Sequence, residues 1–382
     1  TGVEITGATN NIIMSDGDGG TIANTNFSYD GIRLDLDTNL NLNNTYIGSG
    51  TGNDTAGNSN NIGIGRNAVA GVLTSGATGT IGIGYNSLSG LTSGANNLAI
   101  GYEAMKVHTT GARNIAIGAE AMDDTNAGST SLASEDNTFI GYRAGSGTWA
   151  DAASNYNIGI GKFVMDAVMN GAEHNIGIGQ YSLSALTEGE DNTAIGNSAL
   201  GNLSTGNFNV GIGDRAGVNV TTGTNNIHLG YLAGYGGNTT GNVAIGSEAL
   251  KSCAASSNVA IGYQAGRFTT ANDGVWVGAS AGTTGTGGGQ SVIVGNYAGQ
   301  HIVGSQVTHI GAQSGRYASG SQNTFMGYQA GLGGTTSAPY SSGTNNVAVG
   351  TYAFDGFTTA GETTAIGYNA GGSITTGIRN VT

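Results

Sequence analysis

A short segment that alternates aliphatic and small residues, and that ends in glycine, recurs along most of the chain. It reads NNLAIG, NIAIG, DNTAIG, GNVAIG and SNVAIG at different places. Nineteen such segments follow one another, and most are 16 or 17 residues apart. This period is too short for a pair of helices and fits one coil of a β-solenoid, with short strands joined by corners. The pattern therefore predicts an all-β chain in which residues 44–382 form a parallel β-solenoid of about nineteen coils.

The last residue of each segment, here called the motif glycine, defines the coils. Glycine suits the end of a strand where the chain must turn with backbone angles that a Cβ forbids. The motif glycines are Gly48, Gly65, Gly84, Gly101, Gly118, Gly141, Gly161, Gly179, Gly196, Gly213, Gly230, Gly246, Gly262, Gly278, Gly295, Gly311, Gly327, Gly350 and Gly367.

Two rows of branched residues precede the motif glycine. The residue directly before it is aliphatic in every coil, and the residue three before it is Val, Ile or Thr in every coil except at Leu98. These two positions point to the same side of a strand, and β-branched side chains suit a buried, pleated surface. The pattern therefore predicts that this side is the core of the solenoid. The expected core residues include Ile64, Ile83, Ile100, Ile117, Ile178, Ile195, Ile212, Ile245 and Ile261.

The position between these two rows is Ala or Gly in twelve coils. It points to the other side of the strand, and a row of small side chains allows close packing. We therefore interpret it as a column through which copies of the chain contact one another in a homo-oligomer. The expected inter-chain column contains Ala99, Ala116, Ala194, Ala244 and Ala260.

Asparagine stands four residues before the motif glycine in fourteen coils, for example at Asn114 and Asn192. Its side chain bonds to neighbouring backbone groups, and stacked asparagines form ladders in repetitive β structures. The sequence predicts a hydrogen-bonded ladder along one corner.

Composition narrows the class of protein. Glycine makes up 72 of 382 residues, charged residues are 9%, and the net charge is −13. An acidic chain with few cations does not favour binding to nucleic acid or to anionic membranes. The single cysteine, Cys253, excludes an intrachain disulfide framework. No run of eighteen apolar residues is present, so we expect no membrane insertion by this segment.

Several short motifs suggest chemistry, but each has a simpler interpretation. GIGRNA and GIGDRA match a dinucleotide-binding pattern that requires a following helix, and the repeat produces them by its register. GASAG around Ser280 matches the spacing of a hydrolase nucleophile but has no placeable His and acid partners. Asp16 and Asp18 could ligate calcium, although a solvated turn is favoured. We expect no enzyme activity and no cofactor.

Large residues replace the small middle residue in some coils, among them His228 and His309. In a threefold assembly such histidines could form a ring that holds a metal or an anion. The favoured alternative is that they fill a wider gap between chains. Trp276, Phe139 and Phe325 occupy the same position.

With these columns in place, the chain resembles the head repeats of YadA-like trimeric autotransporter adhesins over about residues 44–382. The resemblance rests on the order of asparagine, β-branched residue, alanine, isoleucine and glycine in NIAIG, NVAIG and NTAIG. It implies a left-handed β-roll in a homotrimer, with the alanine column towards the other chains. Similar repeats occur in phage tail fibres.

The ends and the long coils complete the organisation. Residues 1–43 do not keep the period and are interpreted as an N-terminal cap or the end of a preceding module, and the solenoid is expected to continue beyond the fragment. Two steps, from Gly118 and from Gly327, are 23 residues long and predict protruding loops, where binding residues often lie. Tyr340, in the second of these steps, and Trp149, in the 20-residue step after Gly141, are the candidate ligand contacts.

The expected function is a non-catalytic structural and adhesive segment of an extracellular trimeric fibre, on a cell surface or a virion. Its expected partners are copies of itself and a cell-surface glycan or protein. The alternative is an ice- or mineral-binding solenoid that uses its rows of Thr and Ser.

Overall fold

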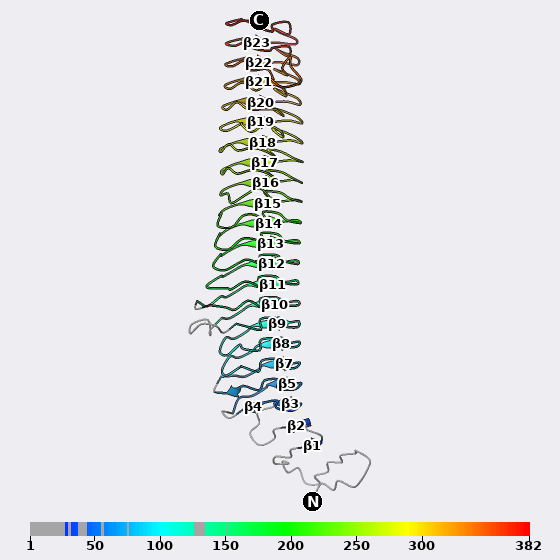
Figure 1. The fold of residues 1–382 in the computed structure, drawn as a ribbon, viewed down its shortest axis with the longest axis vertical. Helices are drawn as coiled ribbons and strands as arrows, with labels where there is room; N and C mark the ends of the chain where they lie inside the picture. The colour runs from blue at the N-terminus through cyan, green and yellow to red at the C-terminus, as the bar shows by residue number, and fades with distance from the viewer. Residues whose placement is uncertain are drawn as a thin grey trace, which may run out of the picture.

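The computed structural model describes residues 44–382 apart from 55–56, 75, 126–133 and 151, together with two short strands before them. The described chain is a rod of coils stacked along one axis (Figure 1). It is all-β and contains a parallel β-solenoid of about 18 turns, without a helix in these residues. The predicted fold class is confirmed at this level.

Each coil contributes one strand of three residues, and all of these strands pair in parallel in one sheet. Like positions pair with like positions, so Ala99 pairs with Ala116 and Ile100 with Ile117. The strands are β3 (Thr45–Ile47), β5 (Ile62–Ile64), β7 (Ile81–Ile83), β8 (Leu98–Ile100), β9 (Ile115–Ile117), β10 (Thr138–Ile140), β11 (Ile158–Ile160), β12 (Ile176–Ile178), β13 (Thr193–Ile195), β14 (Val210–Ile212), β15 (Ile227–Leu229), β16 (Val243–Ile245), β17 (Val259–Ile261), β18 (Val275–Val277), β19 (Val292–Val294), β20 (Thr308–Ile310), β21 (Thr324–Met326), β22 (Val347–Val349) and β23 (Thr364–Ile366).

Four further strands lie in the N-terminal part of the chain. β1 (Phe27–Tyr29) pairs antiparallel with β2 (Ile32–Leu36), which pairs antiparallel with β3. β4 (Asn53–Asp54) and β6 (Val72–Leu73) form a separate parallel pair. Asp16 and Asp18, the candidate calcium ligands, lie outside the described residues.

The interior of the solenoid is on the opposite side of the strand from the one that the sequence predicted. Ala99, Ala116, Ala194, Ala244 and Ala260 are each 0% exposed within a single chain, so they cannot form the inter-chain column. The predicted core isoleucines are instead partly exposed on the other side: Ile64, Ile178, Ile195 and Ile261 are 36–38% exposed, and Ile83, Ile100, Ile117, Ile212 and Ile245 are half-buried. Both assignments were wrong.

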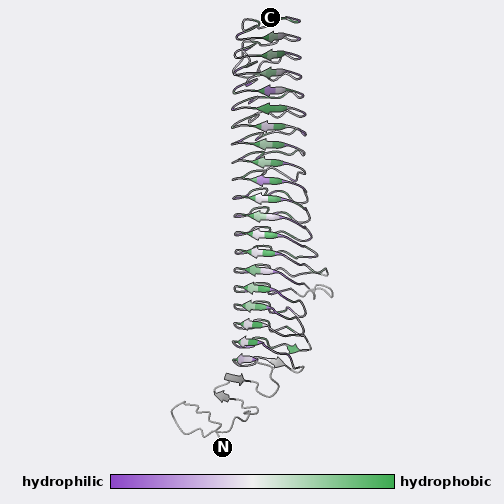
Figure 2. Ribbon diagram, turned by 180° about the vertical axis from the view of Figure 1, so that it is seen from behind, coloured by the Kyte–Doolittle hydropathy of each residue, from purple (hydrophilic) through white to green (hydrophobic). Residues whose placement is uncertain are grey.

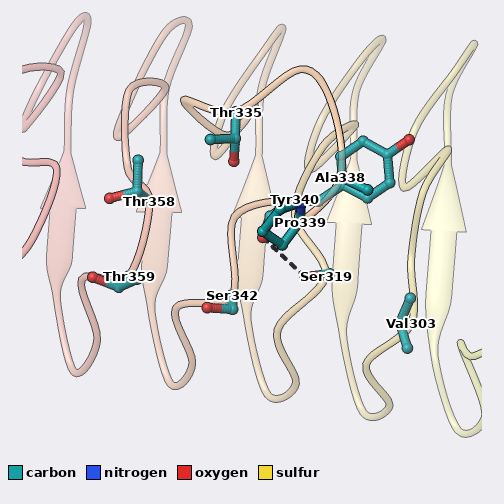
Figure 3. A pocket seen from close by; sticks show the side chains of 9 residues that line it. All are labelled: Val303, Ser319, Thr335, Ala338, Pro339, Tyr340, Ser342, Thr358 and Thr359. Carbon is teal, nitrogen blue, oxygen red and sulfur yellow. Dashed lines mark hydrogen bonds between the residues drawn. The ribbon is translucent and has the colours of Figure 1, made fainter.

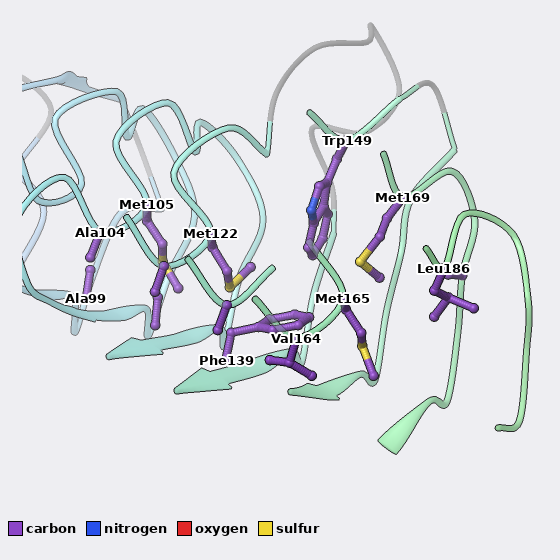
Figure 4. Packing of buried hydrophobic residues seen from close by; sticks show 14 of the residues in the cluster. Ala99, Ala104, Met105, Met122, Phe139, Trp149, Val164, Met165, Met169 and Leu186 are labelled. Carbon is purple, nitrogen blue, oxygen red and sulfur yellow. The ribbon is translucent and has the colours of Figure 1, made fainter. Parts of the chain in front are cut away.

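The physical reason is the thinness of the coil. The middle residue of the strand faces a second segment of the same coil, which brings in the residues three and four positions after the motif glycine. Ala104 and Met105 occupy these positions in the coil of Ala99, and both are fully buried. Figure 4 shows the methionines and Phe139 gathered in this narrow interior. A second row of branched side chains would not fit there, so the isoleucines point outwards.

The sizes of the two facing residues compensate each other. Seven coils carry a large middle residue, and each has glycine four residues after its motif glycine: the pairs are Tyr46 with Gly52, Phe139 with Gly145, His228 with Gly234, Trp276 with Gly282, Ile293 with Gly299, His309 with Gly315, and Phe325 with Gly331. A Cβ on Gly331 would lie 2.3 Å from the ring of Phe325. Coils with a small middle residue place Leu, Met, Val or Phe there in nine cases, such as Met105 in the coil of Ala99. A large residue at one of the two positions therefore goes with a small residue at the other in sixteen of the nineteen coils, and the remaining three coils are small at both.

The motif glycines have the backbone conformation that their position predicted. Their φ angles run from 125° at Gly65 to 144° at Gly161. At Gly196, a Cβ would also lie 2.5 Å from the carbonyl oxygen of Gly213 in the next coil. Glycine is required here both for the positive φ and for the close approach of successive coils.

The asparagine ladder is also confirmed. The side-chain oxygen of Asn175 accepts hydrogen bonds from the backbone N–H of Asn192, at 3.1 Å, and from its side-chain amide, at 3.0 Å. The same amide of Asn192 donates to the carbonyl of Gly206 at 2.8 Å. Since these groups are fully buried, the ladder satisfies polar atoms that the corner would otherwise leave without partners.

His228 and His309 point into this interior, so neither the predicted ring between chains nor the predicted inter-chain gap is correct. Both rings are fully buried, and none of their nitrogens has a hydrogen-bond partner in the described structure. His309 stacks on Phe325, with ring centroids 5.0 Å apart. Burial lowers the pKa of His228 to about 4 and that of His309 to about 3.

These two histidines predict a loss of stability in mild acid. Because both folded-state pKa values lie below the ordinary 6.5, the unfolded chain binds the protons first as the pH falls. Stability is therefore complete above about pH 6.5 and decreases towards pH 4, by about 1.4 kcal/mol per pH unit for each histidine. His309→Phe, which continues the stack on Phe325, is expected to melt at a less pH-dependent temperature between pH 7 and pH 4.

The control is His174→Phe, which replaces an exposed imidazole. The measurement is the melting temperature by circular dichroism at each pH. An equal pH dependence in His309→Phe and the unmodified chain would contradict the assignment of this effect to a neutral, buried imidazole.

Candidate functional site

The outward side of the strands forms a continuous, uncharged and mainly aliphatic surface, which we call the aliphatic face. It consists of the residues one and three positions before each motif glycine. The row directly before the glycines is Ile, Leu, Val or Met in all nineteen coils, and no residue of either row is charged. Figure 2 shows the strands as one column along the rod, most of them with hydrophobic residues.

The aliphatic face is partly exposed along its whole length. Ile160, Ile178 and Ile195 are 37–38% exposed, and Leu229 is 41% exposed. Nineteen coils at a strand spacing of ~4.8 Å make this face ~90 Å long. Single chains that remain monomeric rarely expose contiguous apolar patches above a few hundred Å², so a face of this length is typical of an interface.

Trp149, one of the two candidate ligand contacts, is buried and cannot contact a ligand. Its side chain is 0% exposed and packs edge-on against Phe139, with ring centroids 5.9 Å apart. Its indole N–H donates to the carbonyl of Gly145 at 3.1 Å. Trp149 therefore fills the core where the chain returns to the strand, as Figure 4 shows, and this prediction was wrong. The loop predicted after Gly118 includes residues 126–133, which lie outside the described residues.

Tyr340, the other candidate, lies beside a pocket of about 600 Å³ (Figure 3). The pocket is on the corner where each coil returns towards its strand, and the long segment between Gly327 and Gly350 forms one wall. Its lining residues are Val303, Ser319, Thr335, Ala338, Pro339, Tyr340, Ser342, Thr358 and Thr359. The structure thus keeps Tyr340 as a candidate and separates it from Trp149.

A stack of rings holds Tyr340 in place. Its ring lies 4.4 Å from that of His301, at 26° between the planes, and 6.3 Å from that of Tyr317. His301 also contacts the hydroxyl of Thr284 at 2.7 Å, and the Arg316 guanidinium lies 5.1 Å from the centre of the Tyr317 ring. The wall of the pocket is therefore built on ordered side chains of several coils. Sequence reasoning missed the contribution of His301 and Tyr317, because these residues belong to the coils before the long one.

The rows of Thr and Ser on this corner mostly bond to the next coil. The hydroxyl of Thr92 donates to the carbonyl of Thr109 at 3.0 Å, and that of Thr187 donates to the carbonyl of Ser204 at 3.1 Å. These hydroxyls stabilise the stacking of coils. A hydroxyl that already donates to the protein cannot donate to an ice or mineral lattice, so the geometry does not favour that alternative.

The motifs that resembled catalytic sequences lie in repeat positions. Turns follow the strands at GIGRNA and GIGDRA, where nucleotide binding would need a helix. Ser280 is nearly buried and has a φ of 57°, as other residues two after the motif glycine do. Among the described residues, no group of three or more His, Cys, Asp or Glu side chains could hold a metal ion. In the same residues, no helix has the length and apolar character needed to cross a membrane.

Comparison with known proteins adds no relative: no protein-family model matches the sequence, and no curated protein matches it.

Proposed function

We propose that this chain is a non-catalytic, structural and adhesive segment of an extracellular fibre, a cell-surface adhesin or a phage tail fibre. The chains of the fibre associate as a homotrimer through the aliphatic face. The observation that carries this proposal is the uncharged, partly exposed aliphatic row that continues through all nineteen coils.

The periodicity of this face favours a second copy of the same chain as its partner. Its side chains repeat at the spacing of neighbouring strands, ~4.8 Å, over the length of the rod. A partner that covers the whole face must present apolar groups with the same period, and a parallel copy of the chain does so. The number of three chains is supported by the resemblance to trimeric adhesin heads, whose motif shares the same order of residues.

The association replaces the inter-chain contact that the sequence suggested. Burial of apolar surface stabilises an interface by ~25 cal/mol per Å². Here the buried surface would add up over many coils. Because no charged side chain lies in either row, the chains can approach without leaving unpaired charges. A rod with three equivalent outer corners would present its loops to the surroundings, which suits an adhesive fibre.

Light scattering on the purified chain tests the assembly. The chain mass is 37.8 kDa, and the expected species has three times that mass at micromolar concentration and neutral pH. Cross-linking through cysteines placed on the aliphatic face would then show whether like coils meet like coils. A folded monomer that persists at these concentrations would contradict the proposal.

A further inference from the structure

The pocket beside Tyr340 combines apolar and hydroxyl-bearing surfaces. Val303, Ala338, Pro339 and the ring of Tyr340 supply carbon surfaces, and five Ser and Thr residues surround them. Its volume of about 600 Å³ lies within the range of small-molecule sites. Figure 3 shows these side chains spread over the corners of successive coils.

The hydroxyls differ in their availability. Ser319 donates to the carbonyl of Ser341, and Thr358 donates to the carbonyl of Thr375. Thr335 contacts the hydroxyl of Ser341 at 3.0 Å. Ser342 and Thr359 are exposed. Within the described residues, they hydrogen-bond to the protein through their backbone N–H groups and not through their hydroxyls. These two hydroxyls are free to bond to a molecule in the pocket.

The charge of the site restricts the class of ligand. None of the nine lining residues is charged, and the chain as a whole carries −13. An anionic ligand would find no cation in the lining and would be repelled by the whole chain. A cationic ligand would find no carboxylate in the lining. The site therefore suits a neutral molecule with both apolar faces and hydroxyl groups.

The pocket is also placed where assembly would leave it open. None of its nine lining residues lies in a strand, and the aliphatic face consists of strand residues only. A fibre assembled through the aliphatic face would keep the return corner in contact with solvent.

We infer that this pocket binds a neutral saccharide, about one or two sugar units long, with an apolar sugar face against Tyr340 and Pro339. Sugar hydroxyls bond to Ser342 and Thr359. A pyranose ring has this combination of C–H surface and hydroxyl rim, and aromatic rings pack against such C–H surfaces. The inference names the ligand class for the adhesive role proposed above and rests on that role.

The test uses the purified, assembled chain on an array of neutral hexose and N-acetylhexosamine oligosaccharides, with sialylated and sulfated counterparts. We expect binding to neutral sugars. The affinity for the strongest neutral ligand is then measured by surface plasmon resonance for Tyr340→Ala and for the double variant Ser342→Ala/Thr359→Val. Each is expected to bind about tenfold more weakly or worse. Tyr263→Ala, which removes an exposed tyrosine far from the pocket, is the matched control and is expected to bind normally.

Tyr340→Ala could weaken binding by loosening the loop that carries Tyr340. The double variant does not have this effect, because it removes two exposed hydroxyls that make no hydrogen bond within the protein. Absence of binding to neutral sugars, binding to acidic sugars only, or full affinity in both pocket variants would overturn the inference. Light scattering on the same samples separates the two proposals: a monomer that binds sugar through this pocket would refute the assembly and leave the pocket standing.

Discussion

The double variant Ile178→Glu/Ile195→Glu is expected to separate the proposed assembly into folded single chains. The two residues are paired neighbours on β12 and β13, and each is 37% exposed on the aliphatic face. In a single chain their carboxylates would stay in water, so the coil keeps its fold. In the assembly they would be buried without partners, which costs several kcal/mol for each charge. Light scattering should show the mass fall from that of three chains to that of one.

Gln180→Glu provides the control, because it adds a carboxylate at an exposed position just outside the face. It is expected to remain assembled. Circular dichroism should show the same β signal for the double variant and the unmodified chain. If the double variant kept its assembled mass, or if it unfolded, the aliphatic face would not be the surface through which the chains associate.

Replacing Ala99 with phenylalanine is expected to destabilise the solenoid, and a second substitution is expected to reverse most of the effect. Ala99 and Met105 are both fully buried in the interior of one coil, so the larger ring overpacks the coil by about 1–3 kcal/mol or more. Met105→Gly alone leaves a cavity and costs about 2–5 kcal/mol. Together they reproduce the arrangement of Phe139 with Gly145. Glycine also suits position 105, where φ is 49°.

The double-mutant cycle is measured by denaturant unfolding of the two single variants and the double variant. A coupling of about 2 kcal/mol in favour of the pair is expected, since a ring at the middle position needs the space above the position of residue 105, as the Phe139 ring does at Gly145, where a Cβ would lie 2.8 Å from it. Additive destabilisation by the two substitutions would show that the facing residues do not compensate each other in size.

The stacked fold was predictable because the residues that define each coil recur at a regular spacing in the sequence. Fixed spacing, the asparagine four residues before the motif glycine, and the glycine itself each repeat often enough to identify a coil, its corner and its turn. Which side of the strand is buried was not predictable from alternation alone. In a strand of three residues, the middle side chain points to one side and the two outer side chains point to the other. The outer side chains are larger and branched, and they were therefore assigned to the core.

One signal could have corrected this assignment. Glycine occurs four residues after the motif glycine in every coil with a large middle residue, as with Trp276 and Gly282. Two residues of one coil that compensate each other in size must face each other in the interior. An exposed or inter-chain middle residue would not constrain a position six residues further along the same chain.

The candidate ligand contacts show a different limit. Trp149 and Tyr340 were both predicted as ligand contacts because they are aromatic residues in coils longer than the repeat. Trp149 proves to fill space beside Phe139, whereas Tyr340 stacks on His301, which belongs to an earlier coil. The difference depends on contacts between coils of unequal length, which a single repeat pattern does not describe.

The in-register pairing of the strands makes the coil a unit of length. Removing residues 180–196 would delete one whole coil. Gly179 would then stack on Gly213 and Asn175 on Asn209 in the following coil, so the same backbone contact and the same asparagine hydrogen bonds would form again. The rod would become ~4.8 Å shorter with its cross-section unchanged. Gain or loss of whole coils can therefore set the length of the rod without redesign of its core or its outer face.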